Sequence, residues 1–163
     1  MELKHRVNWR RFITLFYVAA FAMYMVLGLQ PAEARHYEIS GNLTIPAIGL
    51  ESDVTTLELE EQRLETPDTI VGSYAKDPSK VLLIGHSTTV FRNLNDLGVE
   101  DKINYNGDDY LVTKMETLAK DEINMNTLLA PAHDSTLVMM TCAGEMIGNR
   151  DATHRLIVTA VKI

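Results

Sequence analysis

The sequence predicts a mainly β domain, folded as a small closed barrel or a sandwich and preceded by a hydrophobic N-terminal segment. Short apolar runs are separated by turn residues roughly every 8–12 residues, a spacing typical of small all-β domains. Residues 41–163 show no long amphipathic helix. Hydrophobic residues make up 46% of the 163 residues, so this region is expected to form one domain with its own core.

The N-terminal segment is predicted to anchor the protein in the cell membrane as a single-pass protein. Residues 1–11 are basic, and Phe12–Leu29 carry no charge. As a helix this apolar run would reach roughly 27 Å, close to a hydrocarbon thickness of about 30 Å. The basic flank predicts a cytoplasmic N-terminus, with the domain outside the membrane on a polar stalk, residues 30–40. The alternative is a signal peptide cleaved after Ala34, which also exports the domain.

The domain is expected to begin with short strands. Gly41–Pro46 is predicted as an edge strand because its final proline cannot donate to a β ladder. Ala47–Val54 reads as a turn that leads into a second strand, and Thr55–Glu65 fits either a surface helix or a strand and loop. Val81–Ile84 is a continuous aliphatic run of strand length, which indicates a fully buried strand.

The middle of the domain combines a short helix or loop with a hairpin. Ser87–Leu97 is polar, with Val90, Phe91, Leu94 and Leu97 at helical spacing. Asp101–Asn106 and Asp109–Lys114 are predicted as strands that turn across Asn106-Gly107-Asp108. Leu118–Pro131 is expected to be a loop with short elements.

The last two predicted strands are Thr136–Thr141 and Arg155–Ile163, separated by a loop. If they pair in antiparallel fashion, the end of the first lies beside the start of the second. Arg155 would then lie next to Cys142, the only cysteine in the chain. His86 follows the Val81–Ile84 run, so a neighbouring strand could bring it to the same rim.

Cysteine, histidine and arginine at one rim would supply a nucleophile, an acid–base group and an oxyanion stabiliser. Each residue also has a structural explanation. Cys142 could be a small core residue, and His86 without a partner could merely follow a strand end. A free thiol in an exported protein is a liability, however, and its reactivity would explain its presence.

Other residues compete for the same roles. His133, before the last strand pair, is the second candidate for the base. Arg150 is the alternative cation, but Arg155 is preferred because a strand start fixes a side chain better than a loop does. His154 is expected to point to the opposite face from Arg155, because side chains alternate along a strand.

Composition excludes several classes of function. The net charge of −7 argues against non-specific nucleic-acid binding. One cysteine excludes an intramolecular disulfide and a multi-cysteine metal site. The later loops carry five carboxylates that lack the spacing of a calcium loop: Asp108, Asp109, Glu116, Asp121 and Glu122. We therefore expect a solvated acidic surface, with no metal and no cofactor.

Thr141-Cys142, followed after a loop by Arg155 and the aliphatic Leu156-Ile157-Val158, resembles the signature of the sortases, cell-surface cysteine transpeptidases of mainly Gram-positive bacteria. The family's upstream Thr-Leu pair is displaced here by two positions, to Thr136-Leu137. Val81–Ser87 looks like the sortase histidine segment, and Gly41–Leu50 looks like the opening strand. The resemblance spans residues 40–163 and implies a closed β-barrel of about eight strands.

The resemblance also implies a reaction. Cys142 would attack the threonine carbonyl of a Leu-Pro-x-Thr-Gly-like sorting motif, cleave between Thr and Gly, and form a thioacyl intermediate. His86 would move protons, Arg155 would hold the substrate and the oxyanion, and Thr141 would help orient the substrate. The implied partners are surface proteins with a C-terminal sorting motif and an acceptor amine on a peptidoglycan cross-bridge or a pilin. The short stalk predicts an open groove without a lid.

Two other functions stay open. The first is an exported cysteine peptidase or hydrolase. An amidopeptidase places its cysteine before its histidine, the reverse of Cys142 and His86, and Thr141-Cys142-Ala143-Gly144 does not match the cluster of L,D-transpeptidases. The second is a membrane-anchored binding module in which the cysteine is structural.

Overall fold

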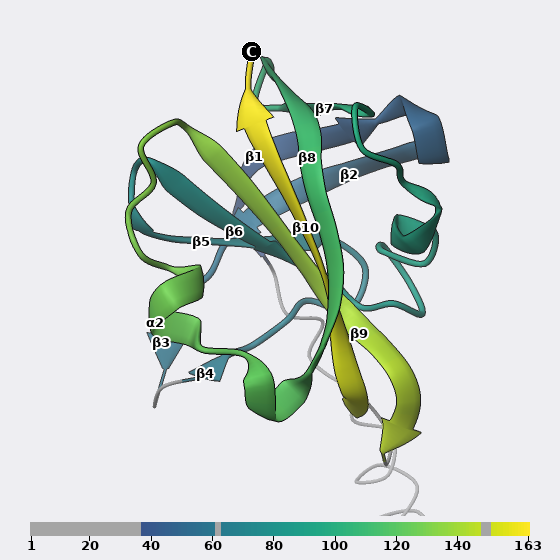
Figure 1. Ribbon diagram of the computed structural model, residues 1–163. Helices are drawn as coiled ribbons and strands as arrows, with labels where there is room; N and C mark the ends of the chain where they lie inside the picture. The colour runs from purple at the N-terminus through teal and green to yellow at the C-terminus, as the bar shows by residue number, and fades with distance from the viewer. Residues whose placement is uncertain (1–36, 61–62, 148–150) are drawn as a thin grey trace, which may run out of the picture. The chain divides into compact units, whose positions relative to one another are not determined.

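Eight strands close into a barrel (Figure 1). The computed structural model describes residues 37–60, 63–147 and 151–163. The barrel strands are β1 (Ile39–Ile45), β2 (Leu50–Thr56), β5 (Val71–Asp77), β6 (Lys80–Ile84), β7 (Lys102–Tyr105), β8 (Asp108–Ala119), β9 (Thr136–Ile147) and β10 (Asp151–Lys162). Around the barrel they follow the order β1-β2-β5-β6-β9-β10-β8-β7, and β7 pairs with β1 to close it. The predicted closed barrel of about eight strands is confirmed, and the sandwich alternative is wrong.

Small elements surround the barrel. β3 (Leu59–Glu60) and β4 (Arg63–Leu64) form a separate two-stranded sheet. Helix α2 (Met125–Leu128) and the 3₁₀ turns η1 (Pro46–Ile48), η2 (Leu94–Asp96) and η3 (Lys120–Glu122) complete the described part. None of the helices in this part is long and apolar enough to cross a membrane. The predicted membrane segment, Phe12–Leu29, lies outside the described residues.

The predicted hairpin is present and longer than expected. β7 and β8 pair in antiparallel fashion across Asn106 and Gly107, which both adopt positive φ angles (53° and 85°). Glycine and asparagine adopt this conformation at low cost, which is why they favour tight hairpin turns. β8 continues to Ala119, beyond the predicted end at Lys114.

β5 was not predicted. Its sequence, VGSYAKD, has few large apolar residues, and its buried positions are Val71, Gly72 and Ser73. β5 pairs with β2 in parallel and with β6 in antiparallel fashion, so pairing rather than apolar periodicity makes it a strand. The ambiguous Thr55–Glu65 segment forms the end of β2 and the β3–β4 region, and the helix alternative is wrong there.

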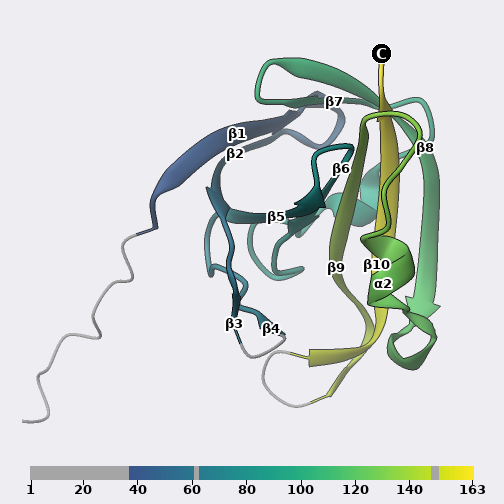
Figure 2. The ribbon, with the colours of Figure 1, turned by 90° about the vertical axis from the view of Figure 1, so that its left-hand side faces the viewer.

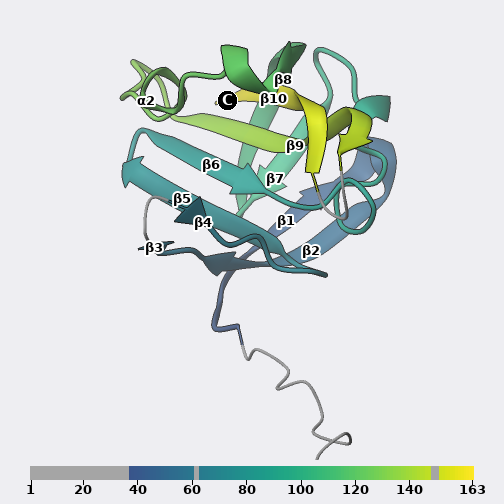
Figure 3. The ribbon, with the colours of Figure 1, turned by 90° about the horizontal axis from the view of Figure 1, so that it is seen from below.

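Both faces of β6, β9 and β10 are covered, which explains their continuous aliphatic runs. Alternate residues point into the barrel interior: Leu83, Leu137, Met139 and Val158. Their neighbours form a second cluster on the outer face: Leu82, Ile84, Val138 and Ile157. Leu64 and the α2 residue Leu128 pack against this outer cluster. Figures 2 and 3 show β6 and β9 between α2 on one side and the β3–β4 pair on the other.

The region between Cys142 and Arg155 differs from the prediction. A loop was predicted over residues 143–154, but β9 continues to Ile147 and β10 begins at Asp151. β9 pairs with β6 only as far as Met140, so this part of the β9–β10 hairpin projects past β6 (Figure 1). Glycine and polar residues interrupt the few apolar residues of this part, so its sequence resembles that of a loop.

Candidate active site

Three neighbouring strands bring His86, Cys142 and Arg155 to one place. β6 and β9 run parallel with Ile84 opposite Met140, so His86 and Cys142 each lie two residues beyond this pair. Arg155 of β10 is the direct register partner of Cys142. The antiparallel arrangement and the shared rim predicted from the sequence are therefore present, although Cys142 lies within a strand rather than at its end.

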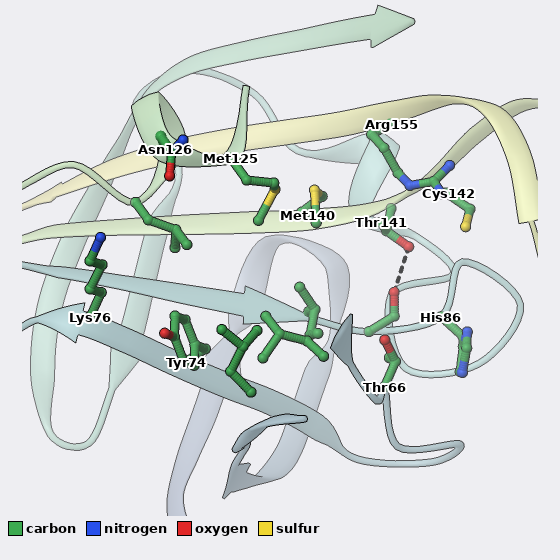
Figure 4. Close-up of a pocket in the computed structure, with 15 residues that line it drawn as sticks. Thr66, Tyr74, Lys76, His86, Met125, Asn126, Met140, Thr141, Cys142 and Arg155 are labelled. Atoms are coloured by element: carbon green, nitrogen blue, oxygen red, sulfur yellow. Dashed lines mark hydrogen bonds between the residues drawn. The ribbon is translucent and has the colours of Figure 1, made fainter. Parts of the chain in front are cut away.

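These three side chains lie at one end of a groove on the outer face of the barrel (Figure 4). The groove has a volume of about 740 Å³. Its floor comes from β5, β6 and β9, and its walls come from the β3–β4 region and α2. Six of the lining residues are large and apolar: Leu59, Leu64, Ile84, Met125, Leu129 and Met140. Lys76 lies at the opposite end from Cys142 (Figure 4).

The His86 segment is fixed by the barrel core. Carbonyl oxygen O of His86 accepts hydrogen bonds from the backbone N–H groups of Thr89 (3.2 Å) and Phe91 (3.0 Å). Phe91 and Leu94 are fully buried in the interior cluster. Gly85 permits this close turn, because a Cβ there would lie 2.6 Å from Cγ1 of Val90. The segment after β6 therefore packs Phe91 and Leu94 into the barrel interior, and this packing positions His86.

The His86 imidazole is mostly buried but retains a free hydrogen-bonding atom. Its side chain is 21% exposed, and Nε2 lies 3.8 Å from Oδ1 of Asp68. That separation is too long for a hydrogen bond, and Nε2 has no hydrogen-bond partner in the described part of the chain. Buried polar atoms are rarely left without a partner, so Nε2 of His86 is a candidate for a functional role.

Thr141 connects β9 to the His86 segment. Its side chain is buried, and Oγ1 donates a hydrogen bond of 2.7 Å to the carbonyl oxygen of Gly85. Figure 4 shows this bond at the floor of the groove. Thr141 therefore fixes the residue that precedes His86, and its hydroxyl is already engaged on the protein.

Cys142 is a half-buried free thiol that lines two cavities. Besides the large groove, it borders a smaller cavity of about 240 Å³ with His86, Asp68 and Met146. Four hydroxyl side chains complete the lining of this cavity: Thr69, Ser87, Thr88 and Thr89. Cys142 and His86 thus lie where the groove meets this smaller cavity.

The Arg155 guanidinium is held in place by several hydrogen bonds. Nη1 donates to the carbonyl oxygens of Ala152 and His154, both at 2.9 Å. Nη2 donates to Oδ1 of Asp151 at 2.6 Å. Asp151 also pairs with Lys120. Two hydrogen bonds lower the pKa of the Asp151 carboxyl well below its ordinary range. The bond from Lys120 has the larger effect, and the bond from Arg155 comes second.

His133 and His154, the other histidine candidates in the domain, do not line the groove. His133 precedes β9, at the opposite end of that strand from Cys142, and its side chain is 98% exposed. His154 has Nδ1 2.8 Å from Oγ1 of Thr153 and does not line the groove, in agreement with its predicted orientation. Arg150 lies outside the described residues.

The acidic residues of the later loops have local partners. Asp108 pairs with Lys162, Glu116 pairs with Lys114, and Asp109 accepts a hydrogen bond from Asn104. Across residues 37–60, 63–147 and 151–163, no three His, Cys, Asp or Glu side chains gather as a metal ion would require.

Sequence reasoning missed Asp151 and Lys120. Asp151 fell in the predicted loop, and its contact with Lys120 joins residues 31 positions apart. The one local signal is the opposite charge of Asp151 and Arg155, which is common on any polar surface.

Comparison with known proteins identifies the family. The family model described as "Sortase domain" matches residues 43–163, more than half of the chain. A comparison with curated proteins gives no match. Solved structures share the fold. Sortase A from Corynebacterium diphtheriae, a lid mutant, has a TM-score of 0.61 at 20% identity, covering 81% of this chain and 74% of that one.

Two further structures are similar over most of their length. Sortase C-1 from Actinomyces oris has a TM-score of 0.61 at 22% identity, covering 86% of this chain and 79% of that one. Sortase E1 from Streptomyces coelicolor, solved with a tripeptide in its active site, has a TM-score of 0.59 at 18% identity, covering 77% of this chain and 88% of that one. With its barrel, its Thr141-Cys142 strand and this family match together, the chain belongs to the sortase family.

Proposed function

We propose that this sortase is a cysteine transpeptidase that cleaves a Leu-Pro-x-Thr-Gly-like sorting motif between Thr and Gly. The acyl part is then transferred to an amine on the cell wall or on a pilin. The observation that carries the proposal is the convergence of Cys142, His86 and Arg155 at one end of the groove. Nucleophile, acid–base group and cation are the three parts that acyl transfer requires.

In the first half of the reaction, the Cys142 thiolate attacks the threonine carbonyl carbon. Arg155 stabilises the oxyanion of the tetrahedral intermediate. The C–N bond then breaks, the leaving amine takes a proton from the His86 imidazolium, and a thioester remains on Cys142. The free Nε2 of His86 is suited to this proton transfer.

In the second half, the acceptor amine attacks the thioester carbon and gives a proton to His86. The C–S bond breaks, which restores the Cys142 thiolate and completes the new amide. The two cavities that meet at Cys142 suggest where the substrates bind. The apolar residues of the groove suit the Leu-Pro side of the motif, and the smaller cavity, which the Asp68 carboxylate lines, suits a cationic amine.

Incubation of the full-length chain in detergent with a Leu-Pro-x-Thr-Gly peptide and an amine, followed by mass spectrometry, tests the proposal. We expect a Thr–amine product that Cys142→Ala abolishes. Absence of cleavage would contradict it and would favour the binding module. Cleavage that survives Cys142→Ala would also contradict it, because Cys142 would then not be the nucleophile. Hydrolysis that added amine never diverts would instead identify an exported peptidase.

We infer that the chain is anchored in the cell membrane by Phe12–Leu29, with the barrel outside the cytoplasm. The uncharged run and its basic N-terminal flank support this topology. Membrane fractionation and protease treatment of intact cells test it, and the mass of the mature protein shows whether cleavage after Ala34 occurs. Recovery of the barrel in the cytoplasmic fraction would contradict the inference.

A further inference from the structure

Arg155 has fewer free hydrogen-bond donors than an exposed arginine. A guanidinium carries five N–H donors in a fixed plane. Both donors of Nη1 and one donor of Nη2 are engaged with Ala152, His154 and Asp151. Only Nε–H and the second Nη2–H have no partner among the described residues, so the protein itself selects which edge of the guanidinium is available to a substrate.

Among these contacts, Asp151 is the one made by a side chain. It lies four residues before Arg155 on β10 and opposite Ile147 of β9. Its other partner, Lys120, belongs to the η3 turn that follows β8. Leu118 near the end of β8 is the register partner of Arg155. Asp151 therefore connects the arginine to the neighbouring strand.

The charges of this group are balanced in a specific way. A single carboxylate beside Arg155 would largely cancel the positive charge that an oxyanion needs. Lys120 contributes a second positive charge to the same carboxylate, so the three side chains together retain a net charge of one. The group can therefore fix the guanidinium and still present a cation to the groove.

We propose that Asp151 is a positioning residue for Arg155, and that Lys120 offsets the negative charge that this positioning introduces. The inference rests on the proposed role of Arg155 in oxyanion stabilisation. Asp151 acts through the arginine rather than on the substrate. Its removal should therefore lower kcat much more than it changes KM, because a guanidinium that is free to rotate stabilises the transition state less well.

A double-mutant cycle on the full-length enzyme tests the proposal. We expect Asp151→Asn to lower kcat about 10- to 100-fold, since misplacement of a catalytic group by about 1 Å has effects of that order. In the Arg155→Ala background the same substitution should change kcat less than about twofold, because coupled residues are not additive. Asp151→Glu should restore part of the activity. Glu116→Gln, which removes the partner of another exposed lysine, is the matched control and should leave kcat unchanged.

The outcomes separate the inference from the proposed function. Full activity of Asp151→Asn, or an equal loss with and without Arg155, would overturn the positioning role. Full activity of Arg155→Ala would instead remove the assigned role of the arginine. If circular dichroism shows that Asp151→Asn is unfolded, Lys120→Met replaces it in the same cycle. That variant should lose activity only when Arg155 is present, and an Arg155-independent loss or no loss would overturn the proposal.

Discussion

The two ends of the groove each present a cation, but the protein holds these cations very differently. Arg155 is 16% exposed and is fixed by Asp151 and by two backbone carbonyls. Lys76 is exposed and forms no ion pair or hydrogen bond within the described part of the chain. The contrast indicates that the Cys142 end of the groove is preorganised for catalysis. The Lys76 side chain at the other end can adjust to a bound peptide.

Strand register gives the distance between the two ends. Tyr74 of β5 is opposite Leu82, and Leu82 is opposite Val138, so Lys76 lies near the level of Leu137. Cys142 is five residues further along β9, roughly 16 Å at about 3.3 Å per residue. An extended peptide acylated on Cys142 would therefore bring a residue four or five positions before the attacked carbonyl close to Lys76.

The largest effect is expected from Arg155→Lys, which keeps the charge but removes the planar arrangement of donors. A lysine cannot bond to Asp151 and to both carbonyls while it also faces an oxyanion. We expect kcat to fall about 100-fold, as when an oxyanion donor is lost. Steady-state kinetics on a sorting-motif peptide measure the change. A variant with normal kcat would show that charge alone suffices and would remove the contrast with Lys76.

A smaller effect is expected at the hydrogen bond between β9 and the His86 segment. Thr141→Val leaves the buried Gly85 carbonyl without a partner, which should lower the free energy of unfolding by about 1–3 kcal/mol. Denaturant unfolding measures this loss. The matched control is Thr113→Val, because the Thr113 hydroxyl also donates to a carbonyl, that of Thr159, but at an exposed position. Equal losses in the two variants would show that the Thr141 bond has no special importance.

Lys76→Glu should change substrate preference with little effect on kcat. For a peptide with an acidic residue four or five positions before the attacked carbonyl, we expect KM to rise about two- to fivefold, the range of an exposed ion pair. A peptide with a basic residue there should show the opposite change. Equal KM values for both peptides with both enzymes would show that the bound peptide does not reach Lys76.

The smallest effect concerns pH. The lowered pKa of Asp151 means that its contribution to stability is present above its ordinary pKa of 3.8 and is lost as pH falls below that value. Because Asp151 is 41% exposed, the contribution is small. The Tm difference between the wild type and Asp151→Asn should be constant from about pH 5 to 8 and shrink below about pH 4. A difference that grows in acid would contradict the ion-pair account.

The sequence predicted the parts of the fold that depend on apolar patterning. Continuous aliphatic runs marked β6 and β9, and antiparallel pairing then placed Arg155 beside Cys142. The parallel pairing of β6 with β9 brings His86 to the same level, at the rim where a neighbouring strand was expected to place it. These relations follow from burial and from register, which leave clear periodic signals.

Polar strands and long-range polar contacts could not be predicted in the same way. β5 is a strand because both of its neighbours pair with it, although Ala75 and Lys76 are exposed. In the projecting β9–β10 hairpin the large apolar residues Met146 and Ile147 are exposed, and no continuous apolar run marks a strand. The pairing of Asp151 with Lys120 depends on the final positions of β8 and β10, which no local pattern of residues records.

The most direct test of the central claim is the mass of the enzyme after reaction with a sorting-motif peptide in the absence of an amine. We expect an adduct equal to the acyl fragment that ends in threonine, bound through a thioester at Cys142 and released by added amine. Cys142→Ser should not form this thioester. An adduct at another residue, or turnover without any adduct at Cys142, would contradict the account.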